Sequence, residues 1–453
     1  YIGSYSVTTS QSRQRGDTGE QAMKLFIMRA VTTFITSAWL RAFRRKVHAY
    51  RRKRKMQKPT VHYFHQADDP YSHLTAQALG AFSKRYNVVL TPWLVSAPED
   101  SAAPEREKLR HYALRDAARV AHEYGFEFPD NATLPATDRV ASTAAALAAA
   151  LTGKTFVEAA AKIGAALWHG DASALPATTK DEAAKAIAAG DAKRKEFGHY
   201  LSAMFYFEGE WYWGIDRLHY LETRLREIGL DTTPEKSAIA PYRDLTLGAA
   251  PKAKSRPVIE YWFSFRSPYS WISAPRMRRL AAHYDCELQL RFILPMVMRG
   301  LPVPSIKRMY ITLDTKREAE SVGLPFGTIV DPVGAGAARA LAVLNHAVPL
   351  GLGDAFAELG MRAAFADGIA LASDAGMLDV AKRAGLTEAQ TRAALADESW
   401  RAKAEANREA LFAAGLWGAP SFRVDGKPAH WGQDRFWALE QDILDAIAER
   451  NAR

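Results

Sequence analysis

The sequence predicts an α/β protein built from two tandem copies of one fold, each with a helical insertion, behind a basic N-terminal arm. Two observations predict the repeat. A strand-like run, a polar turn and a helical pattern occur at residues 61–86 and again at 258–284. Two short strands joined by a tight turn, followed by a helix start, occur at 205–217 and again at 422–435. The length of 453 residues also suits two or three domains.

Changes in composition along the chain give the expected domain boundaries. We expect a leader, an amphipathic helix and a polybasic arm at residues 1–58, a first domain at 59–229, a linker at 230–257 and a second domain at 258–453. The linker is rich in proline and small residues. Alanine-rich stretches within the first copy favour packed helices over a binding function. The 48% apolar and 24% charged content is typical of a soluble globular protein.

The net charge of +10 is concentrated in one stretch. Residues 41–58 contain ten Lys or Arg and no Asp or Glu, so the remainder of the chain is close to neutral. The high pI of about 9.4 therefore gives no support to a nucleic-acid groove in the folded domains. Nucleic-acid binding through residues 41–58 is a weaker alternative, which would require steeply salt-dependent affinity.

Residues 25–40 are mostly apolar, are interrupted by Arg29 and show helical amphipathicity. The run is too short and too amphipathic to favour a bilayer span, and its positive charge follows the apolar part, unlike in a secretory signal. We expect residues 25–58 to adsorb to an anionic membrane face, which places a cytoplasmic protein at the inner side of a membrane. The alternatives are a mobile basic arm or a helix docked on another domain or subunit. Residues 1–22 are polar, and we expect a flexible leader before Met23.

The sequence contains a single cysteine, Cys286. It therefore cannot form an intrachain disulfide, a Cys-X-X-Cys redox pair or a thiolate-only metal site within one chain. Cys286 lies between a predicted helix and a predicted strand, which favours a small, buried, apolar role. No metal site is predicted.

The second copy carries the main candidate for chemistry. Residues 258–271 (VIEYWFSFRSPYSW) predict a strand, a polar turn and a helix start. Pro268 suits the first turn of that helix, which puts Ser267 at or beside the N-cap. Unpaired backbone N–H groups and the helix dipole at this place can hold an anion or a thiolate. The simpler interpretation of Ser267 alone is that it only caps the helix.

Three motifs resemble a known family. They are the Ser-Pro-Tyr-Ser-Trp run at 267–271, Gly-Ala-Pro at 418–420 and Trp-Gly-Gln-Asp-Arg at 431–435. Together with the order of predicted elements, which is that of a thioredoxin-type fold, they resemble kappa-class glutathione transferases and 2-hydroxychromene-2-carboxylate isomerases of the wider DsbA-like group. The resemblance covers roughly residues 257–449. A dithiol oxidase is excluded because both positions of its cysteine pair are serines, Ser267 and Ser270.

The resemblance implies a glutathione site in the second copy. Ser267 would hydrogen-bond the sulfur, and Ala419, before an expected cis Pro420, would pair with the cysteinyl backbone. Gln433 and Asp434 resemble the residues that hold the γ-glutamyl ammonium and carboxylate. Lys307 resembles a lysine near the glycyl end, whereas an asparagine expected in the loop at 299–304 has no counterpart. Five aromatic residues could line a substrate pocket or belong to the core: Trp262, Tyr269, Trp271, Trp417 and Trp431.

Elementary energetics are compatible with a serine that acts without a general base. A model thiol has a pKa near 8.5, and lowering it by about two units requires about 2.7 kcal/mol. A helix N-terminus supplies about 0.3–1 kcal/mol and a hydrogen bond to a charged group about 1.5–3 kcal/mol. The expected reaction is addition of the thiolate to a small, conjugated, aromatic-derived electrophile. Isomerisation and conjugation share this step, and the sequence leaves both open.

The first copy departs from the motif where the chemistry would occur. Asp69 replaces the serine, and its carboxylate would repel a thiolate. Ala203 stands where the second copy has Pro420, so a trans peptide and a remodelled loop are expected. We therefore expect no glutathione binding there. This degeneracy favours the alternative hypothesis, a catalytically retired, membrane-associated scaffold or assembly subunit. The tandem repeat could also stand in for the family's dimer, or the chain could form a homo-oligomer or larger assembly.

Overall fold

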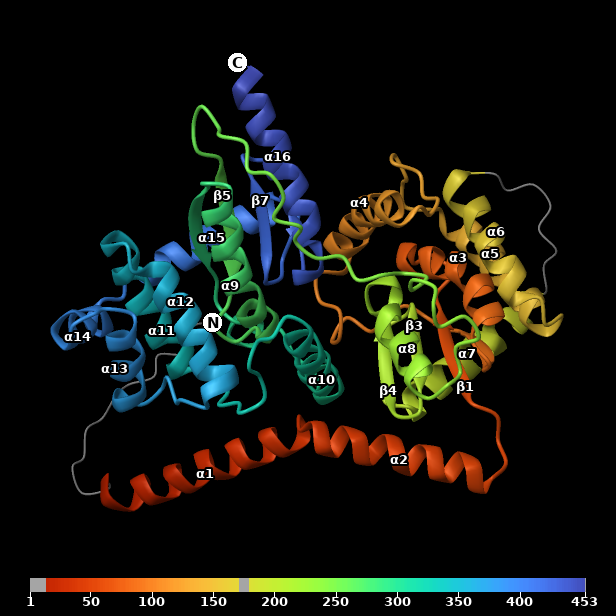
Figure 1. Ribbon diagram of the computed structural model, residues 1–453, viewed down its shortest axis with the longest axis horizontal. Helices are drawn as coiled ribbons and strands as arrows, with labels where there is room; N and C mark the ends of the chain where they lie inside the picture. The colour runs from red at the N-terminus through yellow and green to blue at the C-terminus, as the bar shows by residue number, and fades with distance from the viewer. Residues whose placement is uncertain (1–13, 171–178, 453) are drawn as a thin grey trace.

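The computed structural model describes residues 14–170 and 179–452, which contain two four-stranded mixed sheets with the same topology (Figure 1). The strand orders are β2-β1-β3-β4 and β6-β5-β7-β8. In each sheet the first two strands in the chain are parallel and the other pairings are antiparallel. The predicted fold class, α/β with a repeated thioredoxin-like strand order, is confirmed.

The strands and the helices that start and end each copy follow the expected order. The first copy contains β1 (Thr60–His65), α3 (Pro70–Arg85), β2 (Val89–Leu94), β3 (Met204–Phe207), β4 (Glu210–Trp213) and α8 (Gly214–Glu227). The second contains β5 (Val258–Phe263), α9 (Pro268–His283), β6 (Glu287–Phe292), β7 (Ser421–Val424), β8 (His430–Trp431) and α16 (Phe436–Ala452). Both hairpin turns place a non-glycine residue and then a glycine at positive φ, Glu208-Gly209 and Asp425-Gly426, as tight two-residue turns require.

Helices fill the middle of each copy. The first insertion contains α4 (Arg106–Tyr124), α5 (Thr137–Thr152), α6 (Phe156–His169) and α7 (Lys180–Glu196). The second contains η1 (Met296–Arg299), α10 (Ser305–Ser321), α11 (Ala335–Ala347), η2 (Val348–Leu350), α12 (Gly353–Arg362), η3 (Ala363–Asp367), α13 (Asp374–Arg383), α14 (Glu388–Ala396) and α15 (Trp400–Ala413). A capping box at Thr387 and Gln390 starts α14.

Each sheet has its own apolar core, and α16 joins the two. Tyr63 and Phe205 are among the buried residues of the first core, and Tyr261 and Phe422 among those of the second. Trp437 of α16 packs into the first core, although its helix belongs to the second copy. The irregular segment at 230–257 contacts both copies. The two copies therefore share packed side chains in addition to their covalent link.

Two N-terminal helices, α1 (Gln14–Ile35) and α2 (Ala38–Arg54), run along one side of the molecule beneath both copies (Figure 1). The predicted amphipathic helix at 25–40 is thus interrupted, and the polybasic stretch is helical. Ser37 caps α2 by accepting a hydrogen bond from the Leu40 amide at 3.1 Å, which starts a new helix there. Among the described residues no single helix meets the length and hydropathy of a bilayer span, whereas the α1–α2 pair, bent by 47°, meets them jointly.

Candidate thiol-binding site

The β5–α9 junction holds the predicted nucleophile-stabilising residue at a helix start. Ser267 is the N-cap of α9, its hydroxyl accepts a hydrogen bond from the Ser270 amide at 3.2 Å, and Pro268 occupies the first turn. The Ser267 side chain is half-buried, so it is not sealed within the core. The local sequence and the local structure therefore agree at this point.

The Gly-Ala-Pro loop meets this helix start. The Ala419–Pro420 peptide is cis, as expected. The Ser267 hydroxyl donates a hydrogen bond to the Ala419 carbonyl at 3.0 Å. The fold thus brings together a hydroxyl, a helix N-terminus and the proline peptide from segments more than 150 residues apart. A hydroxyl proton that rests on a carbonyl can rotate to a stronger acceptor if one approaches.

Gln433 and Asp434 are also close to α9, but their polar atoms already have protein partners. They lie in a short 3-10 turn, η4 (Gln433–Arg435), that precedes α16, and do not form the first turn of that helix. Gln433 is buried; its amide accepts a hydrogen bond from Arg276 at 2.6 Å and donates to Glu318 at 2.5 Å. Asp434 accepts a hydrogen bond from Arg217 of the first copy at 2.7 Å. A γ-glutamyl group would have to compete with these contacts.

Lys307, on α10, points toward the first copy. Its ammonium donates a hydrogen bond to the carbonyl of Ala102 at 2.7 Å. Burial lowers the pKa of Lys307 to about 8, because the charged form loses hydration. The lysine lies at the junction of the two copies, in a position that the sequence did not predict.

The aromatic residues are mostly core. Trp262, Trp271 and Trp417 are buried, and the indole N–H groups of the first two donate to backbone carbonyls at 2.9 Å. Tyr269 and Trp431 are half-buried. The Tyr269 hydroxyl donates to the buried Asp314 carboxylate at 2.7 Å, so of these five residues Trp431 is the one left as a candidate for contact with a substrate. Of the two alternatives that the sequence left open, the core therefore holds for Trp262, Trp271 and Trp417.

Cys286 is a buried thiol, as predicted. Burial raises its pKa to about 12, so it stays protonated at neutral pH. The cysteine therefore has no reactive thiolate to offer to the candidate site.

The first copy fills the equivalent position with its own carboxylate. Asp69 caps α3 through hydrogen bonds from the amides of Tyr71 (3.2 Å) and Ser72 (3.1 Å). The hydroxyls of Ser72 and Ser202 donate to the same carboxylate at 2.7 and 2.9 Å. Burial raises the pKa of Asp69, although these hydrogen bonds oppose the shift. The group is a closed structural cap.

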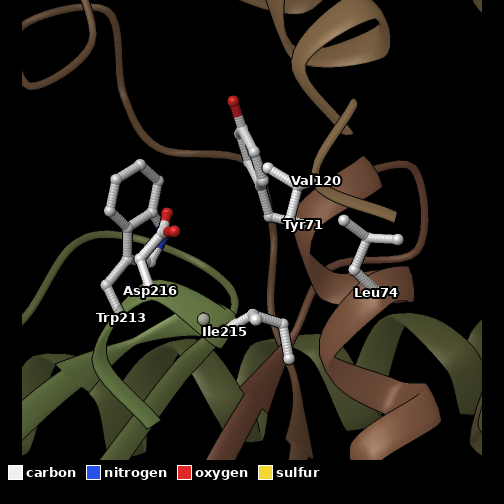
Figure 2. Close-up of a pocket in the computed structure, with 7 residues that line it drawn as sticks. Tyr71, Leu74, Val120, Trp213, Ile215 and Asp216 are labelled. Carbon is white, nitrogen blue, oxygen red and sulfur yellow. The ribbon is translucent and has the colours of Figure 1, made fainter. Parts of the chain in front are cut away.

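The loop opposite Asp69 is remodelled as well. Strand register puts Ala203 in the place of Pro420, and Ala203 follows a trans peptide with a φ of 54°. The hollow nearby, of about 10 Å³, is close to the minimum for one water molecule (Figure 2). It is lined by Tyr71, Leu74, Val120, Trp213, Gly214, Ile215 and Asp216. The first copy therefore offers no space for a peptide at this hollow.

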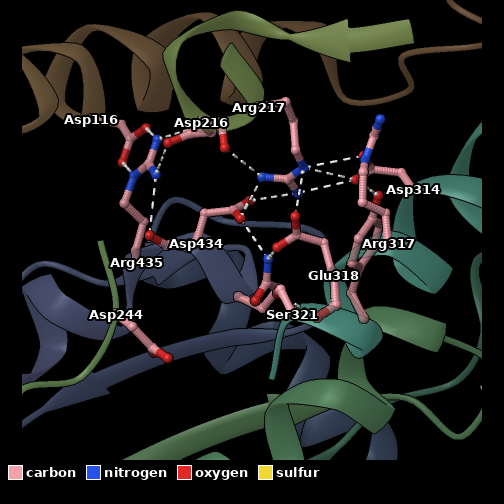
Figure 3. Close-up of polar contacts among 12 residues, drawn as sticks. Asp116, Asp216, Arg217, Asp244, Asp314, Arg317, Glu318, Ser321, Asp434 and Arg435 are labelled. Atoms are coloured by element: carbon pink, nitrogen blue, oxygen red, sulfur yellow. Dashed lines mark hydrogen bonds and ion pairs between the residues drawn. The ribbon is translucent and has the colours of Figure 1, made fainter. Parts of the chain in front are cut away.

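Two arginines cross between the copies. Arg217 of the first copy is 2% exposed and contacts three carboxylates of the second: Asp314 at 3.0 Å, Glu318 at 3.1 Å and Asp434 at 2.7 Å (Figure 3). Burial opposes ionisation of Asp314, but Arg217 and Arg317 outweigh it and hold its pKa well below the ordinary value. The sequence-predicted Asp434 is thus part of a buried ion cluster.

Arg435 of the second copy makes the reciprocal contacts. It is 3% exposed and pairs with Asp116 and Asp216 of the first copy, each at 2.8 Å (Figure 3). The hydroxyl of Tyr71 donates to Asp116 at 2.8 Å, and Tyr269 makes the equivalent bond in the Arg217 cluster at 2.7 Å. Both arginines end the repeated Trp-Gly-X-Asp-Arg motif. The two copies therefore contact each other in a quasi-symmetric manner.

Comparison with known proteins identifies the second copy. The family model described as a DSBA-like thioredoxin domain matches residues 258–444, less than half of the chain. Residues 258–444 form a DsbA-like thioredoxin domain. A search of curated protein sequences gave no match. The first copy, with the same strand order, lies outside the matched region.

Several solved structures are similar to part of this chain. A 2-hydroxychromene-2-carboxylate isomerase is 20% identical with a TM-score of 0.36, and the alignment covers 43% of this chain and 98% of that one. A probable DsbA oxidoreductase from Streptomyces coelicolor is 22% identical (TM-score 0.35; 44% and 91% covered). The cytosolic disulfide reductase DsbM from Pseudomonas aeruginosa with GSH is 20% identical (TM-score 0.33; 43% and 98% covered).

Proposed function

We propose that the DsbA-like domain binds glutathione and stabilises its thiolate with Ser267, for isomerisation or conjugation of a small aromatic-derived electrophile. The observation that carries the proposal is the 3.0 Å hydrogen bond from the Ser267 hydroxyl to Ala419, beside the cis Pro420 peptide at the start of α9. Glutathione supplies, when bound, a thiol that becomes a nucleophile once ionised.

The contacts of Ser267 set how far a thiol pKa can fall. Turning from the Ala419 carbonyl to a thiolate exchanges a neutral hydrogen bond of about 0.5–1.5 kcal/mol for a charge-assisted one of about 1.5–3 kcal/mol. The α9 N-terminus adds about 0.3–1 kcal/mol. At 1.36 kcal/mol per unit, the sum lowers the thiol pKa by roughly one to two units from 8.5. A thiol at this site would be substantially ionised near neutral pH.

The remaining predicted contacts fit glutathione less well. The Gln433 amide and the Asp434 carboxylate are bonded to protein groups, and Lys307 faces the Ala102 carbonyl. We therefore assign the cysteinyl part of the ligand to Ser267 and Ala419. Contacts to its ends would require the interdomain ion cluster to rearrange.

Isothermal calorimetry on the full chain tests the proposal, with Ser267→Asp as the decisive variant. Aspartate at this position caps the helix in the first copy, so the variant should fold, while its charge should repel a thiolate. Wild type should bind glutathione and show a lowered thiol pKa by thiolate absorbance. The aspartate variant should lose both. Ser202→Ala, in the first copy, is the control. Equal binding by wild type and Ser267→Asp, or no binding at millimolar glutathione, would refute the proposal.

A second candidate function is that of a non-catalytic scaffold in a membrane-associated assembly. The buried ion pairs that Arg217 and Arg435 make across the two copies favour it. They commit Asp434 to a contact with the first copy, while Gln433 is hydrogen-bonded to Glu318 of the same ion cluster. The scaffold hypothesis requires that millimolar glutathione causes no thermal stabilisation of the folded chain. A stabilisation that Ser267→Asp abolishes would exclude it.

A further inference from the structure

Helix α1 turns its polar side toward the protein. The Arg29 guanidinium donates a hydrogen bond to the Gly368 carbonyl at 2.7 Å. The Thr32 hydroxyl accepts one from the Ile329 amide at 3.0 Å, and the hydroxyls of Thr33 and Thr328 share another at 3.0 Å. These contacts fix which side of α1 faces the DsbA-like domain, and that side is polar.

The opposite side of α1 is apolar and exposed to solvent. Met23, Ile27 and Phe34 recur at helical spacing, and each is more than half exposed. A helix docked on a water-soluble protein normally buries its apolar stripe and exposes its polar one. The orientation of α1 is the reverse, which indicates that its outer side meets an apolar medium in another state of the protein.

Helix α2 continues this arrangement. Its inward side carries arginines paired with carboxylates of the first hairpin, Arg45 with Glu210 at 2.8 Å and Arg52 with Glu208 at 2.7 Å. About half a turn of rotation away lie three exposed aromatic residues. They are Trp39, Phe43 and Tyr50. Trp39 and Phe43 stack, with 5.5 Å between ring centroids and 6° between their planes.

We define the outer face as the exposed apolar residues that point away from both copies on these two helices: Met23, Ile27, Val31, Phe34, Trp39, Phe43 and Tyr50. Their exposed fractions run from 47% to 65%. Lys46, Lys53 and Arg54 are exposed among the aromatic residues of α2. Between Met23 and Lys58 the chain has no Asp or Glu. The outer face therefore combines apolar rows with an unopposed positive charge.

We propose that the outer face lies flat on an anionic lipid bilayer, with its apolar side chains in the interface and its basic residues at the headgroups. Amphipathic helices with aromatic residues and a basic fringe bind in this way. Both helices are held along the protein by contacts to the two copies, so they adsorb without crossing the bilayer (Figure 1).

Charge and polarity favour a bilayer over other occupants. A second copy of the chain would bring a second basic face against the first, and like charges repel. A nucleic acid would neutralise the basic residues but would leave the apolar row of α1 in water. An anionic bilayer matches both parts of the face. At 1.5 Å per residue, the helical span from Met23 to Tyr50 gives a contact on the order of 40 Å long.

Vesicle flotation of the full chain tests the proposal. Wild type should float with phosphatidylcholine vesicles that contain phosphatidylglycerol and much less with phosphatidylcholine alone. The triple variant Trp39→Ser/Phe43→Ser/Tyr50→Ser should bind at least about tenfold more weakly, because it removes the buried aromatic area. The triple variant Lys46→Gln/Lys53→Gln/Arg54→Gln should weaken binding on the order of a hundredfold. Each basic residue near the surface contributes about fivefold, and the three factors multiply.

Matched controls separate insertion from general stickiness. The double variant Val333→Ser/Leu350→Ser removes exposed apolar side chains elsewhere and should bind as wild type does. Lipids brominated in the acyl chain should quench fluorescence in wild type more than in Trp39→Phe, because this indole is exposed on the outer face. Unchanged vesicle binding by the aromatic triple variant overturns the proposal. The proposal is also overturned if wild type is a dimer, the aromatic triple variant is a monomer, and neither protein binds vesicles.

Discussion

Asp69 and Ser267 occupy the same position in two copies of one fold and have different surroundings. Two amides and two hydroxyls donate to the Asp69 carboxylate, whereas the Ser267 hydroxyl makes one donation to a carbonyl and remains half-buried. Asp69→Ser should destabilise the protein by about 1–2 kcal/mol, because serine can cap α3 but leaves the Ser72 and Ser202 hydroxyls without their acceptor. Urea unfolding of the full chain measures this. An unchanged midpoint would contradict the structural role of Asp69.

Glu318 is the residue whose charge state should make stability depend on pH. Two arginines, Arg217 and Arg317, face three carboxylates in its cluster, so one carboxylate is in excess. Burial raises the pKa of Glu318 to about 7, and the neighbouring Asp434 and Asp314 add to the shift while Arg217 opposes it. The neutral form stabilises the fold fully below pH of about 4.5, and this contribution is lost as the pH rises to about 7.

Glu318→Gln should remove this pH dependence. Between pH of about 4.5 and pH of about 8, the free energy of unfolding of wild type should fall by roughly 3 kcal/mol more than that of the variant. This value follows from the raised pKa of Glu318 at 1.36 kcal/mol per pKa unit. Chemical unfolding across the pH range measures the difference. Glu320→Gln removes a carboxylate from the partly exposed side of the same helix and is the matched control. If the difference in free energy of unfolding between wild type and Glu318→Gln stays constant with pH, Glu318 is not the source of the pH dependence.

The local sequence predicted the positions of some residues of the site and not the contacts of others. The Pro after Ser267 and the Pro after Ala419 are local signals, and the structure places both serine and peptide as expected. The partners of Asp434 and Lys307 lie in the other copy, at Arg217 and Ala102, and no local pattern predicts a contact between residues this distant. One signal was present: an arginine ends the repeated Trp-Gly-X-Asp-Arg motif in both copies.

At the level of elements, helices end where polar side chains form local hydrogen bonds in place of the regular backbone ones. Residues 388–413 form two helices, α14 and α15, because the Asp397 carboxylate accepts hydrogen bonds from the amide of Ser399 at 2.8 Å and from its hydroxyl at 2.6 Å. In the N-terminal pair, the Thr36 hydroxyl bonds back to the Thr32 carbonyl at 2.7 Å, and Ser37 then starts α2. Periodicity alone does not show such breaks.

Ser37 should therefore control the stability of α2 locally. Ser37→Ala removes the acceptor of the Leu40 amide and should cost about 1 kcal/mol. Amide hydrogen exchange should accelerate by roughly fivefold in the first turn of α2, with little change in the two sheets. Ser37→Asp keeps a cap and should exchange as wild type does. Faster exchange throughout the chain would contradict a local role.

On the scale of the whole molecule, the two copies resemble a dimer joined in one chain. Arg217 and Arg435 each contact carboxylates of the other copy, and each cluster has its own tyrosine hydroxyl as a hydrogen-bond donor. Trp437 adds an apolar contact in the first core. Because charges this deeply buried are costly unless paired, the two copies should unfold together and not as independent domains.

Arg217→Met tests this cooperativity. It leaves Asp314 and its neighbours buried with a reduced positive charge, and breaking a buried pair from one side costs about 3–5 kcal/mol. Arg41→Met removes a partly exposed partner of Glu320 and should cost less than about 1 kcal/mol. Wild type should show one unfolding transition by calorimetry, and Arg217→Met should show an earlier transition or two separate ones, since loss of the cluster uncouples the copies. A single transition displaced no further than that of Arg41→Met would mean that apolar packing, and not the exchanged arginines, joins the two halves.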